Sequence, residues 1–474
     1  MTVELIGVIT VVLGLIGLYA EPTFIVYAFF GMTLLGAAGA IILDSLGGTT
    51  IQPAHLLLGF LAVKLLGNRD VGVGVLRAVA IGSPGFWFLV TAGYATIGAY
   101  VMPRLFLGQT FAFAVRAQGD NYAAPLAPTT SNLTQSIYFI GNCACFLILS
   151  GFGSTEAGRK SLGRAALMCV ILNLIFAALD LVTYATNTTE LLSFVRNSTY
   201  SLLSDTELAG FKRIVGSFVE ASSFGYATLG YFAFATSLWL DGISPRLTLS
   251  LSILSLIALL FSTSTTAYVG LSIYLSFVLA MIFLQFLSRP VRPQMIVLMV
   301  CVPFALSLIV VLICLNDASY AYVSDLLDTL ILNKMSTSSG IERSSWNSQA
   351  IQNFLDTYGF GVGNGSVRAS SFLVAAIASL GFLGAASYAL FLLSIWFQAR
   401  APAPHSVSAM QAAARSACLA WLIAASVSGG FIDLGLSFSA FAALACARVT
   451  APQSRSSPMR ADLSYQGHVP IVLD

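Results

Sequence analysis

Two arginines in one polar stretch of an otherwise apolar chain have the context of anion-binding residues. Arg343 and Arg368 each stand just before a pair of serines, and each pair is expected to open a helix. Free N–H groups at a helix N-terminus and a nearby guanidinium both attract anions. The residues predicted to bind a diphosphate here are Arg343, Ser344, Arg368, Ser370 and Ser371. In the alternative, each arginine forms a loop salt bridge with Glu342 or Asp356, and the serines only cap their helices.

A second group of ionisable residues ends the preceding polar loop. Lys212, Arg213 and Glu220 lie just before an apolar segment. If this stretch is helical, Arg213, Gly216 and Glu220 share one face. We expect Lys212 and Arg213 to hold a phosphate and Glu220 to act as a base or a sugar ligand. The alternative is an interfacial salt bridge that anchors a helix end, since Lys and Arg commonly extend to a membrane surface.

Four alternating glycines, Gly359 to Gly365, lie between the two arginines. They do not form a dinucleotide fingerprint, because the G-x-G-x-x-G spacing and a preceding strand are missing. We interpret the run as a flexible linker. The alternative is a segment whose missing side chains permit close backbone approach.

Composition identifies the class of protein that must position these residues. The chain has 474 residues, of which 57% are hydrophobic and 9% charged, and its mean hydropathy is +0.86. A soluble protein would carry about a quarter charged residues. Apolar runs long enough to span a bilayer recur along the chain, so we expect an all-α polytopic membrane protein with about 12–14 transmembrane helices. The net charge of +2 gives no reason to expect a nucleic-acid partner.

The apolar runs give a span-by-span prediction. Shorter apolar segments at 55–66, 71–82 and 105–115 are tilted spans, re-entrant segments or surface helices. The predicted spans are 3–20, 24–43, 86–101, 133–152, 165–182, 222–240, 247–261, 267–287, 295–315, 371–397, 410–427 and 431–447.

Basic residues in the short loops orient the later spans, because Lys and Arg favour the cytoplasmic side. This places two large loops, 183–221 and 316–370, outside the cytoplasm. The larger loop shows two helical patterns, one through 323–331 and one through 346–358. The predicted division is a transmembrane bundle at 1–315 that includes loop 183–221, an extracytoplasmic catalytic loop at 316–370, C-terminal transmembrane helices at 371–447, and a disordered cytoplasmic tail at 448–474.

Metal and cofactor chemistry have little support in the sequence. None of the three histidines lies in the two large loops, and no His, Cys, Asp and Glu cluster has metal-site spacing. The seven cysteines lie in or beside apolar runs and are interpreted as packing residues. We therefore predict neither a metal nor a cofactor. Asp180, Asp317 and Asp433 lie near the extracytoplasmic ends of spans and either shape a cavity or mark those ends.

Three segments of the chain match the pattern of one known protein family. Residues 216–224 (GSFVEASSF) are similar to the family's Gly-x-Phe-x-Glu-Pro-Ser-x-Phe segment, with Ala221 in place of proline. Residues 260–265 (LFSTST) resemble its serine-rich turn, although the arginine common there is missing.

The third segment, 343–384, resembles the family's large periplasmic loop and the span that follows it. It contains GVGNGS at 361–366 and GFLG at 381–384, and its spacing from Arg343 to Gly359 resembles an Arg-x15-Gly pattern of these loops. Together the three segments resemble the bacterial O-antigen ligase and polymerase superfamily, which includes the Wzy-type O-antigen and exopolysaccharide polymerases. The resemblance covers roughly 212–384.

The resemblance implies a metal-independent glycosyltransferase that polymerises undecaprenyl-diphosphate-linked repeat units at the periplasmic face of the inner membrane. Arg213, Arg343 and Arg368, supported by Lys212, would stabilise the leaving diphosphate. Glu220 would take the proton of the attacking sugar hydroxyl. The implied partners are the lipid-linked glycan, the bilayer, a chain-length regulator and a flippase.

Three other functions remain open at this point. A ligase would transfer finished polysaccharide to another acceptor, but the ligase branch carries a histidine where this chain has Ser370. A transporter or flippase for a polyprenyl-linked glycan would show internal repeats and polar residues near mid-membrane. A structural scaffold for a secretion machine would not require the paired Arg-Ser sites.

Overall fold

The computed structural model describes residues 1–43, 49–113, 122–198, 207–208, 211–317, 320–321, 324, 338–398 and 403–448. It confirms the predicted all-α polytopic class. Seven of the described helices are long and apolar enough to span a membrane: α5 (Pro84–Leu105), α6 (Thr130–Phe152), α7 (Glu156–Ala185), α10 (Thr265–Ser288), α11 (Pro293–Cys314), α14 (Phe372–Phe397) and α15 (His405–Ser428).

The remaining described helices complete the bundle or lie at its ends. The shorter apolar ones are α1 (Leu5–Tyr19), α2 (Pro22–Met32), α3 (Pro53–Leu66), α9 (Pro245–Phe261) and α16 (Gly435–Cys446), and α8 (Ala221–Leu240) runs through the centre. The others are α4 (Arg69–Ala78), α13 (Ser338–Asp356) and the 3-10 helix η2 (Thr189–Val195).

Short antiparallel strands make up the described sheet structure. One sheet joins β1 (Thr2–Val3), β2 (Ile41–Leu43) and β3 (Thr49–Ile51), and two hairpins pair β4 (Phe111–Phe113) with β5 (Ala123–Pro125) and β6 (Glu207–Leu208) with β7 (Phe211–Lys212).

The structure corrects or narrows three of the predicted apolar segments. The predicted span 24–43 ends early, because α2 stops at Met32 and turns lead into β2. Segment 105–115 is not a separate helix over its described part, because Leu105 ends α5 and turns lead from it into β4. Segment 71–82 overlaps α4, whose ten residues rise only about 15 Å and cannot cross an apolar layer about 30 Å thick, so the tilted-span alternative is excluded for it.

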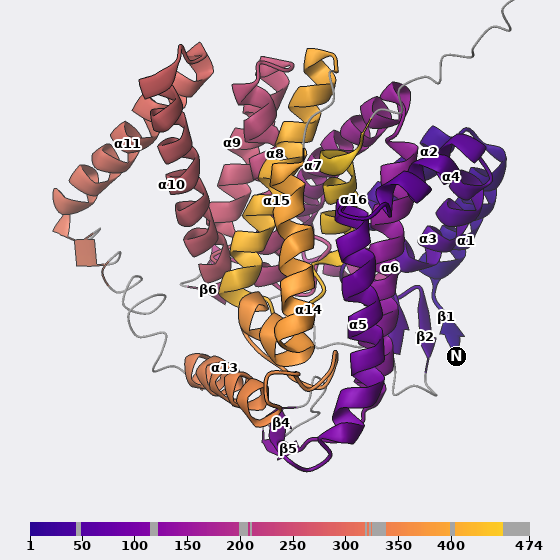
Figure 1. Cartoon of the computed structure of the whole chain (residues 1–474). Helices are drawn as coiled ribbons and strands as arrows, with labels where there is room; N and C mark the ends of the chain where they lie inside the picture. The colour runs from indigo at the N-terminus through magenta and orange to yellow at the C-terminus, as the bar shows by residue number, and fades with distance from the viewer. Residues whose placement is uncertain are drawn as a thin grey trace, which may run out of the picture.

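The core lies where α8 packs against α15. Trp421 of α15 is 1% exposed and its indole N–H donates to the Ala227 carbonyl at 3.2 Å. Gly230 makes this packing possible, because a Cβ there would lie 2.1 Å from the Trp421 ring. By contrast, α11 leans away from the bundle in Figure 1 and has no buried residue.

Helix α14 is broken at Gly381, whose φ is +61° and ψ is −168°. The glycine run of 359–365 fills this break: Val362 N–H donates to Ala378 O at 2.8 Å, and Phe382 N–H donates to Gly359 O at 2.8 Å. Backbone groups freed by a break inside an apolar bundle need such partners. Residues 361–367 are buried, so the flexible-linker interpretation is wrong and the close-approach alternative is confirmed.

The amphipathic pattern through 346–358 corresponds to α13, which lies across the end of the bundle below α14 (Figure 1). The hairpin of β4 and β5 supports it, since Gln349 and Asn353 donate to the Phe111 carbonyl at 2.7 and 2.5 Å. The pattern through 323–331 lies largely outside the described residues, as does the predicted tail after 448.

The two serine pairs have different positions. Ser371 immediately precedes α14, as predicted, although its side chain makes no capping hydrogen bond. Helix α13 begins at Ser338, so Ser344 and Ser345 lie inside it and do not open it. Ser345 instead donates to the Ile341 carbonyl one turn earlier at 2.7 Å.

Candidate functional site

A cavity of about 680 Å³ opens at the end of the bundle that carries α13. Six separate parts of the chain line it: the β3–α3 junction, the first turns of α6, the start of α8, α13, the loop before α14, and the connection from α15 to α16. Its ionisable lining residues are His55, Glu220, Glu342, Arg343, Arg368 and Asp433. Segments far apart in the sequence therefore meet around one polar space.

Arg343 and Arg368 supply the positive charge of this cavity. The Arg368 guanidinium stacks over the Trp346 ring at 3.8 Å from its centroid, which holds it in place. Burial lowers the pKa of Arg368, with Arg343 acting in the same direction and Glu342 and Glu220 opposing it. Neither guanidinium makes a hydrogen bond or an ion pair with a described residue. The alternative, a salt bridge with Glu342 or Asp356, is therefore not formed among the described residues, and both guanidiniums remain available to an anion.

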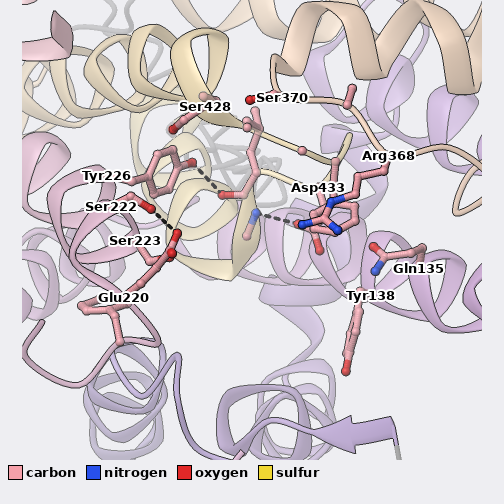
Figure 2. A pocket seen from close by; sticks show the side chains of 18 of the residues that line it. Gln135, Tyr138, Glu220, Ser222, Ser223, Tyr226, Arg368, Ser370, Ser428 and Asp433 are labelled. Carbon is pink, nitrogen blue, oxygen red and sulfur yellow. Dashed lines mark hydrogen bonds between the residues drawn. The ribbon is translucent and has the colours of Figure 1, made fainter. Parts of the chain in front are cut away.

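Glu220 lies across the cavity from Arg368 (Figure 2). It precedes the first residue of α8, and the Ser222 hydroxyl donates to its Oε1. The stretch before it is not helical, because Gly216 has a φ of +60° and α8 begins only at Ala221. The shared-face argument for Arg213, Gly216 and Glu220 is therefore wrong, although Glu220 does reach the cavity.

Arg213 does not line the cavity with the other two arginines. Its guanidinium donates to Thr263, through Nε to Oγ1 at 3.0 Å and through Nη2 to the carbonyl at 3.2 Å. Burial lowers the pKa of Arg213, while the nearby charge of Glu220 raises it. Arg213 thus ties the segment before α8 to the serine-rich turn and places a positive charge within range of Glu220.

Lys212 also lies outside the cavity, in a cluster around Asp180. Asp180 is fully buried near the end of α7, and its Oδ1 lies 2.6 Å from Arg196 Nη2 and 3.6 Å from Lys212 Nζ. Its Oδ2 accepts the N–H groups of Val215 and Gly216 at 2.7 and 3.0 Å. One carboxylate therefore fixes the backbone that leads into Glu220, and no local pattern around Arg196 indicates its part in this cluster.

Neutral hydrogen-bonding side chains line the cavity beside Arg368. Gln135 and Tyr138 come from α6, and Gln52 and His55 come from the β3–α3 junction. The His55 and Tyr138 rings lie 4.7 Å apart, and neither ring nitrogen of His55 has a hydrogen-bond partner. Aromatic rings with amide groups suit sugars, which present both hydroxyls and apolar C–H faces. Sequence analysis missed these residues because each lies singly at the edge of an apolar run.

The connection between α15 and α16 forms another wall. Asp433 accepts hydrogen bonds from the Gly435 N–H at 2.6 Å and from the Asn142 amide. Burial raises the pKa of Asp433, and these two hydrogen bonds partly oppose that effect. Tyr226 fixes the same connection by donating to the Leu434 carbonyl at 3.0 Å. The alternative that Asp433 shapes a cavity is therefore correct.

The structure brings together part of the predicted site. Glu220, Arg343, Arg368 and Ser370 line the same cavity. Ser344 is exposed on α13 and does not line the cavity. Ser371, Lys212 and Arg213 do not line it either. In the part of the chain that the structure describes, no three His, Cys, Asp or Glu side chains gather as a metal site.

Comparison with known proteins adds no assignment: no protein-family model matches the chain, and no curated protein matches it.

Proposed function

We propose that the chain is a glycosyltransferase that lengthens a glycan carried on a polyprenyl diphosphate, as the O-antigen and exopolysaccharide polymerases do. The observation that carries the proposal is the meeting of Arg343, Arg368 and Glu220, from separate segments, around one cavity. Two unpaired guanidiniums suit a diphosphate, and a carboxylate across from them suits a hydroxyl that must lose a proton.

The proposed reaction is a displacement at an anomeric carbon. A sugar hydroxyl of one lipid-linked unit attacks the anomeric carbon of the other, forming a glycosidic C–O bond. The C–O bond to the diphosphate breaks, and the lipid diphosphate leaves with the electron pair. The hydroxyl proton passes to Glu220. Arg343 and Arg368 stabilise the charge that grows on the leaving diphosphate, so the leaving group needs no protonation.

Orientation of two large substrates would supply much of the remaining acceleration. The neutral side chains Gln52, His55, Gln135 and Tyr138 would hold the sugar next to the reacting bond. The proposed setting is the periplasmic face of a bacterial inner membrane, consistent with basic residues gathering at the other end of the helices.

The test is elongation of lipid-linked oligosaccharides by the purified full-length chain with EDTA present. We expect the wild type to form a ladder of products despite the chelator. Arg343→Ala and Arg368→Ala should each reduce the rate by about 100-fold or more, the usual effect of removing a preorganised charge-stabilising donor. Arg104→Ala is the matched control, because Arg104 lies at the same end of the bundle, stacks on Tyr100 and does not line the cavity.

Two results would reject this function. One is equal activity in the control and the two cavity variants. The other is a wild type that moves lipid-linked glycans across vesicles but never lengthens them, which would identify a flippase. A ligase would instead join the glycan to a different acceptor without forming a ladder.

A further inference from the structure

A second cavity, of about 310 Å³, lies at the end of the bundle opposite α13 (Figure 1). It forms where α4, the start of α5, α6 and the ends of α14 and α16 meet. Arg77 of α4 and Arg448, just after α16, line it, and none of its lining residues is Asp or Glu. Neither guanidinium pairs with a carboxylate among the described residues. The cavity therefore presents uncompensated positive charge.

Two buried polar atoms in this cavity have no partner. Ser150 of α6 is 8% exposed, and its hydroxyl makes no hydrogen bond, although a helical serine commonly donates to the carbonyl one turn earlier. The Gln398 amide donates to the Cys446 carbonyl at 3.2 Å, while its Oε1 is buried and unpaired. Buried polar atoms are costly unless a ligand or solvent pairs with them. The cavity thus offers a hydroxyl donor and an amide acceptor beside the two arginines.

The surroundings of the cavity indicate what kind of anion it takes. The N-terminus of α5 opens onto it at Pro84 and Gly85, which adds the positive end of a helix dipole. Apolar side chains beside it in the sequence face outward: Leu76 is 70% exposed, Ile81 91% and Phe397 82%. A free phosphate cannot bury this apolar surface, whereas the acyl chains of a lipid would cover it.

We propose that this cavity binds the headgroup of an anionic phospholipid that carries hydroxyl groups, as phosphatidylglycerol does. Arg77 and Arg448 contact the phosphate, the Ser150 hydroxyl donates to a phosphate oxygen, and Gln398 Oε1 accepts from a headgroup hydroxyl. Basic pockets between transmembrane helices on the cytoplasmic side are suited to anionic headgroups. The site is separate from the proposed glycan chemistry and does not depend on it.

The experiment measures lipid retention and thermal stability of the full-length chain in detergent with phosphatidylglycerol or phosphatidylcholine of the same acyl chains. We expect the wild type to retain phosphatidylglycerol preferentially and to unfold at a higher temperature with it. The double variant Arg77→Ala/Arg448→Ala should bind it about 10–30-fold more weakly, as two arginines near a headgroup imply. Arg246→Ala/Arg289→Ala is the matched control, since it removes the same charge from exposed arginines outside the cavity.

Ser150→Ala separates binding from folding. The Ser150 hydroxyl has no protein partner, so the variant should be at least as stable as the wild type without lipid while gaining less from phosphatidylglycerol. An equal loss of lipid in the control double variant would overturn the proposal, because general surface charge would then explain retention. Stabilisation by inorganic phosphate that matches the effect of the lipid would also overturn it in favour of a free anion.

Discussion

Replacing Asp180 by asparagine tests how the segment before Glu220 is held. The carboxylate is fully buried, faces Arg196 and Lys212, and accepts two backbone N–H groups through its other oxygen. An amide keeps one acceptor oxygen and turns an NH2 group toward the remaining donors, and it removes the buried negative charge that Arg196 and Lys212 face. Removing one partner of a buried ion pair costs about 3–5 kcal/mol. We expect Asp180→Asn to lose stability by that amount.

Asp241→Asn is the matched control for this measurement. Asp241 also pairs with an arginine, Arg292, at 3.1 Å, but the two side chains are 25% and 42% exposed. A solvent-exposed pair contributes only about 0–1 kcal/mol. Equilibrium unfolding of both variants in mixed detergent and SDS micelles would give the two free energies. Similar small losses in both variants would refute the reasoning that Asp180 organises this segment by charge.

Three further substitutions test the elements around the site. Gly363→Ala should destabilise the chain by at least 2 kcal/mol in the same unfolding assay, because φ is +90° there and a Cβ would lie 2.5 Å from the Gly98 carbonyl oxygen of α5. Its control is Gly93→Ala, which adds a Cβ in open space on the same helix and should be neutral or stabilising. Asn132→Ala should loosen the glycine run, because the Asn132 amide donates to the Asn364 carbonyl at 2.7 Å. Limited proteolysis should then cut near the glycine run in the variant and not in the wild type. Trp346→Ala removes the ring beneath Arg368 and should weaken substrate binding by about 2–30-fold, read as a higher KM without loss of the folded protein.

The sequence was a good guide where one local pattern decides the structure. Apolar runs located nearly all of the long helices, and the apolar face through 346–358 identified α13. Arg343, Arg368 and Glu220 stood out because charges are rare in this chain, and all three line the cavity. Rarity of charge in an apolar protein is therefore a usable signal for a polar site.

Features that depend on distant partners could not be read in advance. His55 and Gln135 belong to different helices and meet only through packing, so neither has a local signature. The glycine run was predicted to be a flexible linker, because its burial depends on the break in α14, more than a dozen residues later. Arg213 donates to Thr263 and does not line the cavity. The segment between Arg213 and α8 is not helical and includes Gly216 with a positive φ, which a local pattern did not predict.

The hydrogen bonds between the glycine run and the broken turn of α14 limit how the proposed cavity can admit its substrates. Lifting the segment that carries Arg368 would strip these bonds inside an apolar layer, where no water can replace them. Because the run is bonded to Ala378 before the break and to Phe382 after it, both halves of α14 must move with that segment as one rigid piece. Substrates with long hydrocarbon tails would then enter sideways between helices, and the opening step would be a tilt of the whole of α14 rather than the swing of a lid.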